Sequence, residues 1–198
     1  PCKSMKIQED TSNTIIFSNE DGPQGAITPI ERNMGLPSTW LGFITVDSAD
    51  RTIRKIESLG GTLVIPFQDI PGQPKVIMFT GPEGAALKAI EGNGRNREQS
   101  YKQGGIAWNE LLCSNPIFSF SFLHALTDWD RESVPMWPSN VYHLCKDDKL
   151  SVAGIQNLSQ ELVASAHWLS YFLVDDIEEA CSKIEDLGGS LVTKVVEM

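Results

Sequence analysis

The sequence predicts an α+β fold made of repeated βαβββ modules, and two observations carry this prediction. First, the segment WLGFITVDSADRTIRKIESLGGTLV from Trp40 aligns without a gap to WLSYFLVDDIEEACSKIEDLGGSLV from Trp168, at an offset of 128 residues. Second, short apolar runs with strand character alternate with single amphipathic helices along the chain. We therefore expect one supersecondary unit to be used more than once.

Copy one of the repeat reads as a strand, a helix and three further strands. The apolar strand 41–46 ends at Asp47, which we expect to cap the following helix, and Asp50 places an acid in its first turn. The pair Gly60 and Gly61 supplies the left-handed stop that commonly ends a helix. Turn residues then separate three predicted strands, 62–65, 76–79 and 86–90.

The repeat predicts the same beginning of a module near the C-terminus. A strand is expected over 169–174, a helix cap at Asp175, an acid of the first turn at Glu178 and a strand over 190–193. Cys181 falls on the apolar stripe of this helix, so we expect it to pack in a core. The other members of the stripe are Ile177, Ala180, Ile184 and Leu187.

Between these two segments lies another module. Residues 92–103 are polar and unpatterned, which indicates a linker. A strand over 106–112 and a helix over 116–125 follow, with Asn115 as the cap and Pro116 at the first helical position. Strands over 141–145 and 152–158 complete a second βαβββ pattern.

The offset also divides the chain into two incomplete copies. Residues 1–91 form a partial domain without its opening strand and helix, 92–103 form the linker, and 104–198 form a partial domain without its closing strands. Because open strand edges recruit partners, we predict a homodimer, with exchange of elements as one form of it. The competing explanation is that the chain was cut from a tandem protein of about 260 residues.

Composition narrows the classes of partner. A formal net charge of −10, from 26 acidic and 16 basic residues, opposes binding to nucleic-acid phosphates. No apolar run approaches the length that a membrane-spanning helix needs, and no apolar signal core follows the first residues, so we expect a cytoplasmic protein with no membrane partner. The four cysteines are scattered without zinc-site spacing, which favours reduced structural thiols.

The ordered set of motifs resembles one superfamily. WNELLCSNP, VAGI and HWLSYFLVDDIEEACSKIEDLGG in copy two, with WLGFITVD, DIPG and FTGPEGAALKAIE in copy one, are similar to the vicinal-oxygen-chelate superfamily. That superfamily includes glyoxalases, bleomycin-resistance proteins and extradiol dioxygenases, and the likeness is to its tandem, glyoxalase-like type. The resemblance implies curved mixed sheets with helices on their outer face, around a cleft for a small molecule that often holds a divalent metal.

The resemblance also implies where metal ligands would lie. Metal-dependent members draw His and Glu from the first, fourth, fifth and eighth strands, and here these positions hold Trp108, Gln156 or Gly154, Leu169 and Lys88. An indole, an alkyl chain and an ammonium group donate no lone pair to a cation. We therefore expect no metal or other cofactor, with Trp108, Gln156, Leu169 and Lys88 contacting a ligand instead.

Two polar residues share the inward faces of these strands, because strand side chains alternate with period two. Glu110 lies two residues after Trp108, and His167 lies two residues before Leu169. In the catalytic interpretation Glu110 is a general base or ligand anchor and His167 a proton donor. In the structural interpretation Glu110 is a paired carboxylate and His167 a solvated loop residue. The sequence leaves both interpretations open.

Three functions are compatible with these residues. The first is a protein that binds a small, partly aromatic molecule in a metal-free cleft, as bleomycin-resistance proteins do. The second is a lyase, isomerase or dioxygenase of the same superfamily that uses a divalent metal. The third is a fragment without independent activity.

Overall fold

The structure, a computed structural model, describes residues 6–9, 13–19, 22–30, 37–66, 74–92, 103–136, 140–158 and 164–196. Within these ranges it contains three helices and mixed sheets, which confirms the predicted α+β class. The chain forms two compact units. Unit 1 comprises residues 1–34, 100–107 and 172–198, and unit 2 comprises residues 35–99 and 108–171. Of the predicted linker, residues 93–102 lie outside the described residues.

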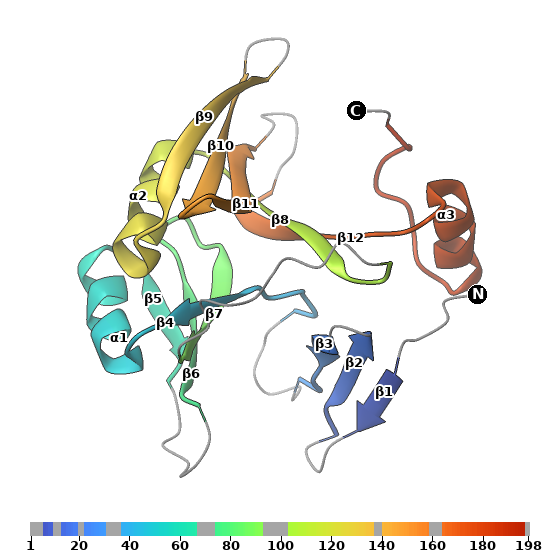
Figure 1. Cartoon of the computed structure of the whole chain (residues 1–198), viewed down its shortest axis with the longest axis horizontal. Coiled ribbons are helices and arrows are strands. Elements are labelled where there is room, and N and C mark those ends of the chain that lie inside the picture. Colours follow the sequence, from blue (N-terminus) through green and yellow to red (C-terminus); the bar gives the residue numbers. More distant parts are fainter. Residues whose placement is uncertain are drawn as a thin grey trace. The chain divides into compact units, whose positions relative to one another are not determined.

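Unit 2 contains the module that the sequence predicted for copy one (Figure 1). Its strands form one sheet in the order β4-β7-β6-β5, with β4 parallel to β7 and the other pairs antiparallel. The last strand therefore returns to lie beside the first. The elements are β4 (Phe43–Val46), α1 (Ala49–Ser58), β5 (Thr62–Ile65), β6 (Val76–Thr80) and β7 (Ala86–Glu91).

A second module repeats this topology, with one further strand beside it. The five-stranded sheet has the order β12-β8-β11-β10-β9, and β8 and β11 are parallel. Asn115 caps α2 as predicted, since its side chain accepts a hydrogen bond from the Phe118 amide. The elements are β8 (Ile106–Cys113), α2 (Pro116–Thr127), β9 (Asp130–Met136), β10 (Asn140–Asp147), β11 (Leu150–Asn157) and β12 (His167–Phe172).

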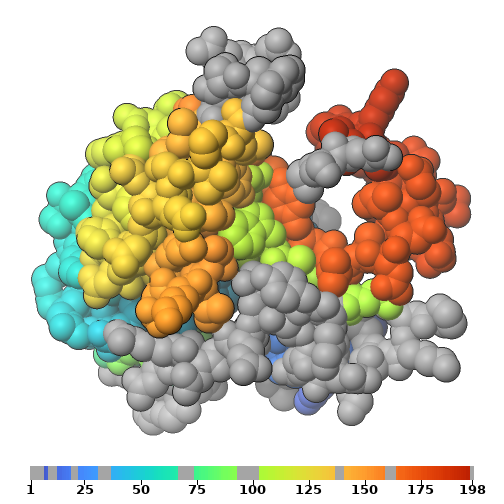
Figure 2. Space-filling view, turned by 45° about the horizontal axis from the view of Figure 1, so that its top comes forward, coloured from blue at the N-terminus to red at the C-terminus, as the bar shows by residue number. Residues whose placement is uncertain are grey.

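The two modules of unit 2 share one hydrophobic core. Helix α1 contacts α2 as well as the sheet of its own module, and in Figure 2 the cyan surface of α1 adjoins the yellow-green surface of the second module. Ile56 of α1 and Phe79 of β6 are fully buried, and the ring centroids of Phe79 and Phe122 lie 6.1 Å apart. Burial of each such side chain stabilises the fold by about 1.5–3 kcal/mol.

Unit 1 contains an antiparallel sheet and the third helix. The sheet has the order β1-β2-β3, and Phe17 of β2 is its buried side chain. The ring of Phe17 occupies the space where a side chain at Gly25 would lie, with ring carbon Cζ 2.3 Å from an ideal Cβ position. The elements are β1 (Lys6–Glu9), β2 (Ile15–Asn19), β3 (Gly22–Ile27) and α3 (Ile177–Asp186).

The helix caps lie one residue later than predicted. Ser48, not Asp47, caps α1 by accepting from the Arg51 amide, and Asp176, not Asp175, caps α3 by accepting from the Glu179 amide. Both caps have the extended backbone of an N-cap residue. The preceding aspartates are therefore outside the helices.

Two predictions for the C-terminal segment are wrong. Residues 190–193 do not form a strand, although their counterpart β5 does so by pairing with β6. Cys181 is only partly covered and α3 buries none of its residues. Residues 190–193 stay irregular because none of the described strands pairs with them.

The described cysteines are free thiols. Cys113 and Cys145 are fully buried, and burial raises the pKa of Cys113 to about 11 and that of Cys145 to about 12. These two thiols are therefore protonated at neutral pH, which suits a role in packing. In the described ranges no helix has the length and hydropathy needed to cross a membrane.

Candidate functional site

Side chains from three strands of the five-stranded sheet, β8, β10 and β12, meet around Glu110. Glu110 lies on β8, and Gly154 of β11 is its partner in the parallel register. Strand alternation puts Trp108 on the same face, while Leu111 and Cys113 point into the core on the other face. Glu110 itself is only 5% exposed, so the group has a buried carboxylate at its centre.

Hydrogen bonds hold this group together. The Tyr171 hydroxyl of β12 donates to Glu110 Oε2 at 2.7 Å, and the Trp108 indole Nε1–H donates to the Tyr142 hydroxyl of β10 at 2.7 Å. The hydroxyl of Tyr142 is close enough to Glu110 for the carboxylate to raise its pKa. A carboxylate costs free energy in a buried place unless it is hydrogen-bonded, and here the Tyr171 phenol supplies a bond. We call Trp108, Glu110, Tyr142 and Tyr171 the Glu110 network.

Gly154 makes room for the ring of Tyr142. An ideal Cβ at Gly154 would lie 1.8 Å from the Tyr142 hydroxyl oxygen and 2.3 Å from ring carbon Cζ. The Tyr142 phenol therefore crosses β11 at the place where any residue other than glycine at position 154 would carry its side chain. This close approach is what allows Tyr142 to reach Trp108 and Glu110.

Both tyrosines are weaker acids than usual. Burial is the largest cause for each, and it raises the pKa of Tyr171 to about 12, with hydrogen bonding to Glu110 and the negative charge of Glu110 adding to the rise. Burial and Glu110 likewise raise the pKa of Tyr142 far above its ordinary value, although the hydrogen bond from Trp108 lowers it. Both phenols stay protonated at neutral pH, so the Tyr171 hydroxyl can act as a donor toward the carboxylate.

The structure brings together most of the residues that the sequence singled out. His167 and Leu169 alternate with Tyr171 on β12 and so share its face, and Gln156 lies two residues after Gly154 on β11. The His167 ring Nδ1 lies 2.8 Å from the Ser165 carbonyl oxygen of its own loop. We therefore place His167 at the margin of the Glu110 network.

Lys88 lies apart from this group, on the four-stranded sheet. It pairs with Phe43 across the parallel β4–β7 register, and its ammonium nitrogen lies 5.3 Å from the centroid of the Phe43 ring. Such a cation–π contact contributes about 0.5–1 kcal/mol at an exposed site. Lys88 and the Glu110 network thus belong to different sheets, whereas the sequence had grouped them as contacts of one ligand.

The donor set of the Glu110 network does not fit a divalent metal. A metal needs several oxygen or nitrogen lone pairs that converge on one point. The network offers one carboxylate, two protonated phenols and an indole N–H that can only donate. Within the described residues there is also no group of three or more His, Cys, Asp or Glu side chains that could hold an ion.

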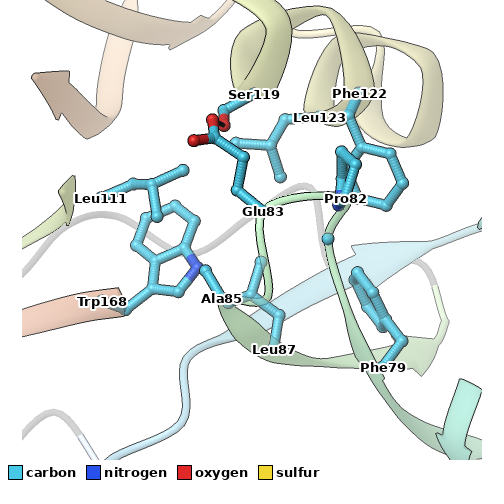
Figure 3. A pocket seen from close by; sticks show the side chains of 11 residues that line it. Phe79, Pro82, Glu83, Ala85, Leu87, Leu111, Ser119, Phe122, Leu123 and Trp168 are labelled. Carbon is cyan, nitrogen blue, oxygen red and sulfur yellow. Dashed lines mark hydrogen bonds between the residues drawn. The ribbon is translucent and has the colours of Figure 1, made fainter. Parts of the chain in front are cut away.

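A small pocket lies elsewhere in unit 2, where the two modules meet (Figure 3). Its volume is about 20 Å³, enough for about one water molecule. The Trp168 indole lies beside Leu111 and Ala85, and the Glu83 carboxylate points toward Ser119. This pocket is far smaller than the several hundred Å³ of a typical ligand site, so it is a packing feature of the shared core.

Glu83 joins the modules at this pocket. Its carboxylate accepts hydrogen bonds from the hydroxyls of Ser114 and Ser119 and from the amides of Ser114 and Asn115, at the N-terminus of α2. Partial burial raises the pKa of Glu83, but these hydrogen bonds together outweigh it and lower the pKa below the ordinary value. A carboxylate at this place also suits the positive end of the helix dipole.

Tyr142 and Tyr171 were not predicted from the sequence, because phenols are not among the usual ligands of such metal sites. One signal was present for Tyr171, which lies two residues after Leu169 and so shares its face. The signal for Tyr142 was weaker, because only the glycine on the neighbouring strand indicates that a large ring crosses there.

No family model matches the sequence. Comparison with known proteins finds relatives named as a glyoxylase and as anthracycline biosynthesis proteins. The chain is 27% identical over 165 residues to CFP32 from Mycobacterium tuberculosis, a protein named as a glyoxylase, covering 83% of this chain and 63% of that protein. It is 25% identical over 171 residues to the anthracycline biosynthesis protein DauV from Streptomyces sp. strain C5, covering 82% and 59%. The chain thus spans about three fifths of the length of these relatives.

A solved structure shares the fold. The 2,2',3-trihydroxybiphenyl 1,2-dioxygenase from Sphingomonas wittichii superposes with a TM-score of 0.53 at 10% sequence identity. The superposition covers 96% of this chain and 72% of that structure. At this identity the likeness concerns the fold alone.

Proposed function

The chain belongs to the vicinal-oxygen-chelate superfamily, and on that premise we propose that it binds a small, partly aromatic molecule at the Glu110 network, without the usual metal. The observation that supports this most is the buried Glu110 carboxylate, which accepts a hydrogen bond from the Tyr171 phenol. A ligand hydroxyl that replaces the Tyr171 hydroxyl as donor to Glu110 would keep the carboxylate hydrogen-bonded.

The surroundings of Glu110 favour a neutral ligand with a planar ring. Trp108, Tyr142 and Tyr171 are uncharged, so an anionic ligand would meet the carboxylate without a nearby cation to offset the repulsion. Tyr171 is 42% exposed, which leaves its ring accessible for stacking. A hydroxylated aromatic molecule satisfies both conditions. The name of DauV, which refers to anthracycline biosynthesis, is compatible with such a ligand.

The alternative is a lyase, isomerase or dioxygenase that uses a divalent metal. The name of CFP32 as a glyoxylase favours this alternative. Elemental analysis of protein purified without chelator separates the two functions. Stoichiometric iron, manganese, nickel or zinc would reject the metal-free proposal, whereas substoichiometric traces support it.

Thermal shift with a dihydroxyanthraquinone tests the binding proposal. A ligand at 100 times its dissociation constant stabilises a protein by about 2.7 kcal/mol, which is readily measured. We expect Glu110→Gln and Tyr171→Phe to reduce the shift, because Glu110→Gln replaces the charged acceptor by a weaker, neutral one and Tyr171→Phe removes the donor. If the shift is the same in Glu110→Gln as in the unmodified chain, Glu110 is not part of the site.

Ser170→Ala is the matched control. Ser170 precedes Tyr171 on β12 but points to the opposite face, where its hydroxyl donates to Asn109 Oδ1 at 2.9 Å. The substitution removes a hydroxyl and a hydrogen bond from the same strand without touching the Glu110 network. The thermal shift should therefore be retained in Ser170→Ala, and its loss there would mean that the variants act through the stability of β12.

A further inference from the structure

We propose that the outer side of the five-stranded sheet binds the phosphate group of a small phosphate monoester, through the Arg131 guanidinium and the Ser133 hydroxyl of β9. The site is a group of side chains from β9, β10 and α2, all within unit 2. We call it the Arg131 cluster, and it consists of Phe120, His124, Arg131, Ser133 and His143.

Strand register places the Arg131 cluster on the face of the sheet opposite to the Glu110 network. Ser133 pairs with His143 across the antiparallel β9–β10 register. Arg131 pairs with Cys145, which is fully buried in the core to which α2 contributes. Cross-strand partners share a face, and Tyr142 points to the other face by alternation. The Arg131 cluster therefore lies on the α2 side and is separate from the ligand site proposed above.

Contacts join the side chains of the cluster to one another. His143 Nδ1 lies 3.1 Å from Ser133 Oγ. The guanidinium carbon of Arg131 lies 5.5 Å from the centroid of the Phe120 ring. The Phe120 ring stacks on the His124 ring, with centroids 5.9 Å apart and 24° between the ring planes. The guanidinium thus rests on an aromatic support, which reduces the freedom that it would lose on binding a ligand.

The Arg131 guanidinium has unused hydrogen-bonding capacity. Among the residues that the structure describes, none accepts a hydrogen bond from it or pairs with its charge. Its neighbours Asp130 and Glu132 point to the opposite face of β9, where Glu132 pairs with Lys146 at 2.6 Å. An unpaired guanidinium in a chain of net charge −10 is therefore available to an anion from outside.

His143 is a buried base beside this cation, since it is only 6% exposed. Burial lowers the pKa of His143 below its ordinary value, and the nearby Arg131 charge lowers it further. The other titratable groups on this face are Cys145 of β10 and His124 of α2, and the sequence of β11 contains none. A proton on His143 Nδ1 makes Ser133 Oγ the acceptor, so that the Ser133 hydroxyl can donate outward to an anion.

The donors match a phosphate better than a carboxylate. Arg131 and Ser133 lie two residues apart on one face of β9, with about 7 Å between their Cα atoms, so both side chains can reach one anion. A phosphate monoester offers more acceptor oxygens and more negative charge than a carboxylate, enough for the guanidinium fork and the hydroxyl together. An extended anionic surface fits less well, because the net charge of −10 repels it.

Phenyl phosphate is the probe, and the imidazole C–H NMR signals of the three histidines of the chain are the readout. His124→Gln and His167→Gln assign these signals. We expect the signals of His143 and His124 to shift with a saturable curve and that of His167, at the margin of the Glu110 network, to stay in place. Saturating phenyl phosphate should also raise the pKa of His143, because the bound anion offsets the Arg131 charge.

Arg131→Gln tests the central contact. It should raise the dissociation constant for phenyl phosphate at least about tenfold, because it removes a charged donor, and it replaces an exposed side chain, so the fold should persist. Arg54→Gln is the matched control. It removes the same charge from an exposed position on α1 and should leave the dissociation constant unchanged. Benzoate should bind the unmodified chain more weakly than phenyl phosphate does.

Several results would overturn the proposal. One is the absence of any saturable shift in the unmodified chain, and another is an equal dissociation constant in Arg131→Gln and the unmodified chain. Benzoate that binds as tightly as phenyl phosphate would reject phosphate as the recognised group. Sedimentation of the chain with phosphatidic acid vesicles, without binding of phenyl phosphate, would reject a small molecule as the ligand.

Discussion

Helices α1 and α3 have closely similar sequences and caps but opposite environments. Ile56 of α1 is completely buried against a sheet, whereas Ile184, at the equivalent position, is 45% exposed. The amphipathic stripe is present in both, so the stripe alone does not determine burial. The difference indicates that burial against the three strands that follow α1, and not the apolar stripe alone, stabilises a helix of this kind.

The largest expected effect comes from truncating the same side chain in the two helices. Ile56→Ala should lower the free energy of unfolding by about 2–5 kcal/mol, because it leaves a cavity in the core of unit 2. Ile184→Ala should change it by less than about 1 kcal/mol, since the side chain is half exposed. Urea unfolding of both variants measures the difference. Equal losses would show that α3 is covered in solution.

A second, smaller effect concerns helix N-termini. Glu83, between β6 and β7, accepts hydrogen bonds at the N-terminus of α2. Glu83→Gln should lower the free energy of unfolding by about 1–2 kcal/mol, because it weakens the bonds to Ser114 and Ser119. Because the folded-state pKa of Glu83 is lowered, its contribution is present above the ordinary glutamate pKa and is lost as the pH falls through the lower folded-state value.

Urea unfolding at several pH values from neutral to acid checks this sign. The difference in stability between the unmodified chain and Glu83→Gln should shrink as the pH falls. A difference that grows toward acid pH would contradict the assigned hydrogen bonds.

The smallest expected effect is that of the ion pair on α1. Asp50→Asn removes the exposed pair with Lys75 and should cost no more than about 0.5 kcal/mol. Glu178→Gln, at the equivalent position of α3, should leave the free energy of unfolding unchanged. A larger loss for Glu178→Gln, measured by the same urea unfolding, would mean that a basic group already pairs with it.

Local sequence was sufficient for most of the fold. Apolar periodicity and turn residues predicted the module from β4 to β7. They also predicted the Asn115 cap of α2. Strand β9 was missed because all its described side chains are exposed and Pro135 interrupts it. It forms because β10 offers a partner. Residues 190–193 show the converse, since a strand-like sequence without a partner remains irregular.

The candidate site was predictable only in part. The alternation of side chains along a strand was enough to place Trp108 and Glu110 on one face of β8. The partners in the Glu110 network, Tyr142 and Tyr171, lie on other strands and 32 and 61 residues away from Glu110 in sequence. Periodicity cannot give such pairings, because they depend on strand order and register.

The contact between Gly154 and Tyr142 restricts how this sheet can change over evolution. A methyl group at 154 would overlap the ring at 142, so an exchange at 154 requires the Tyr142 ring to leave its position. A smaller residue at 142 must come first, and it would abandon the bond to Trp108. The two positions are therefore epistatic: Gly154 can be replaced only after Tyr142, whereas Tyr142 can be replaced while Gly154 remains.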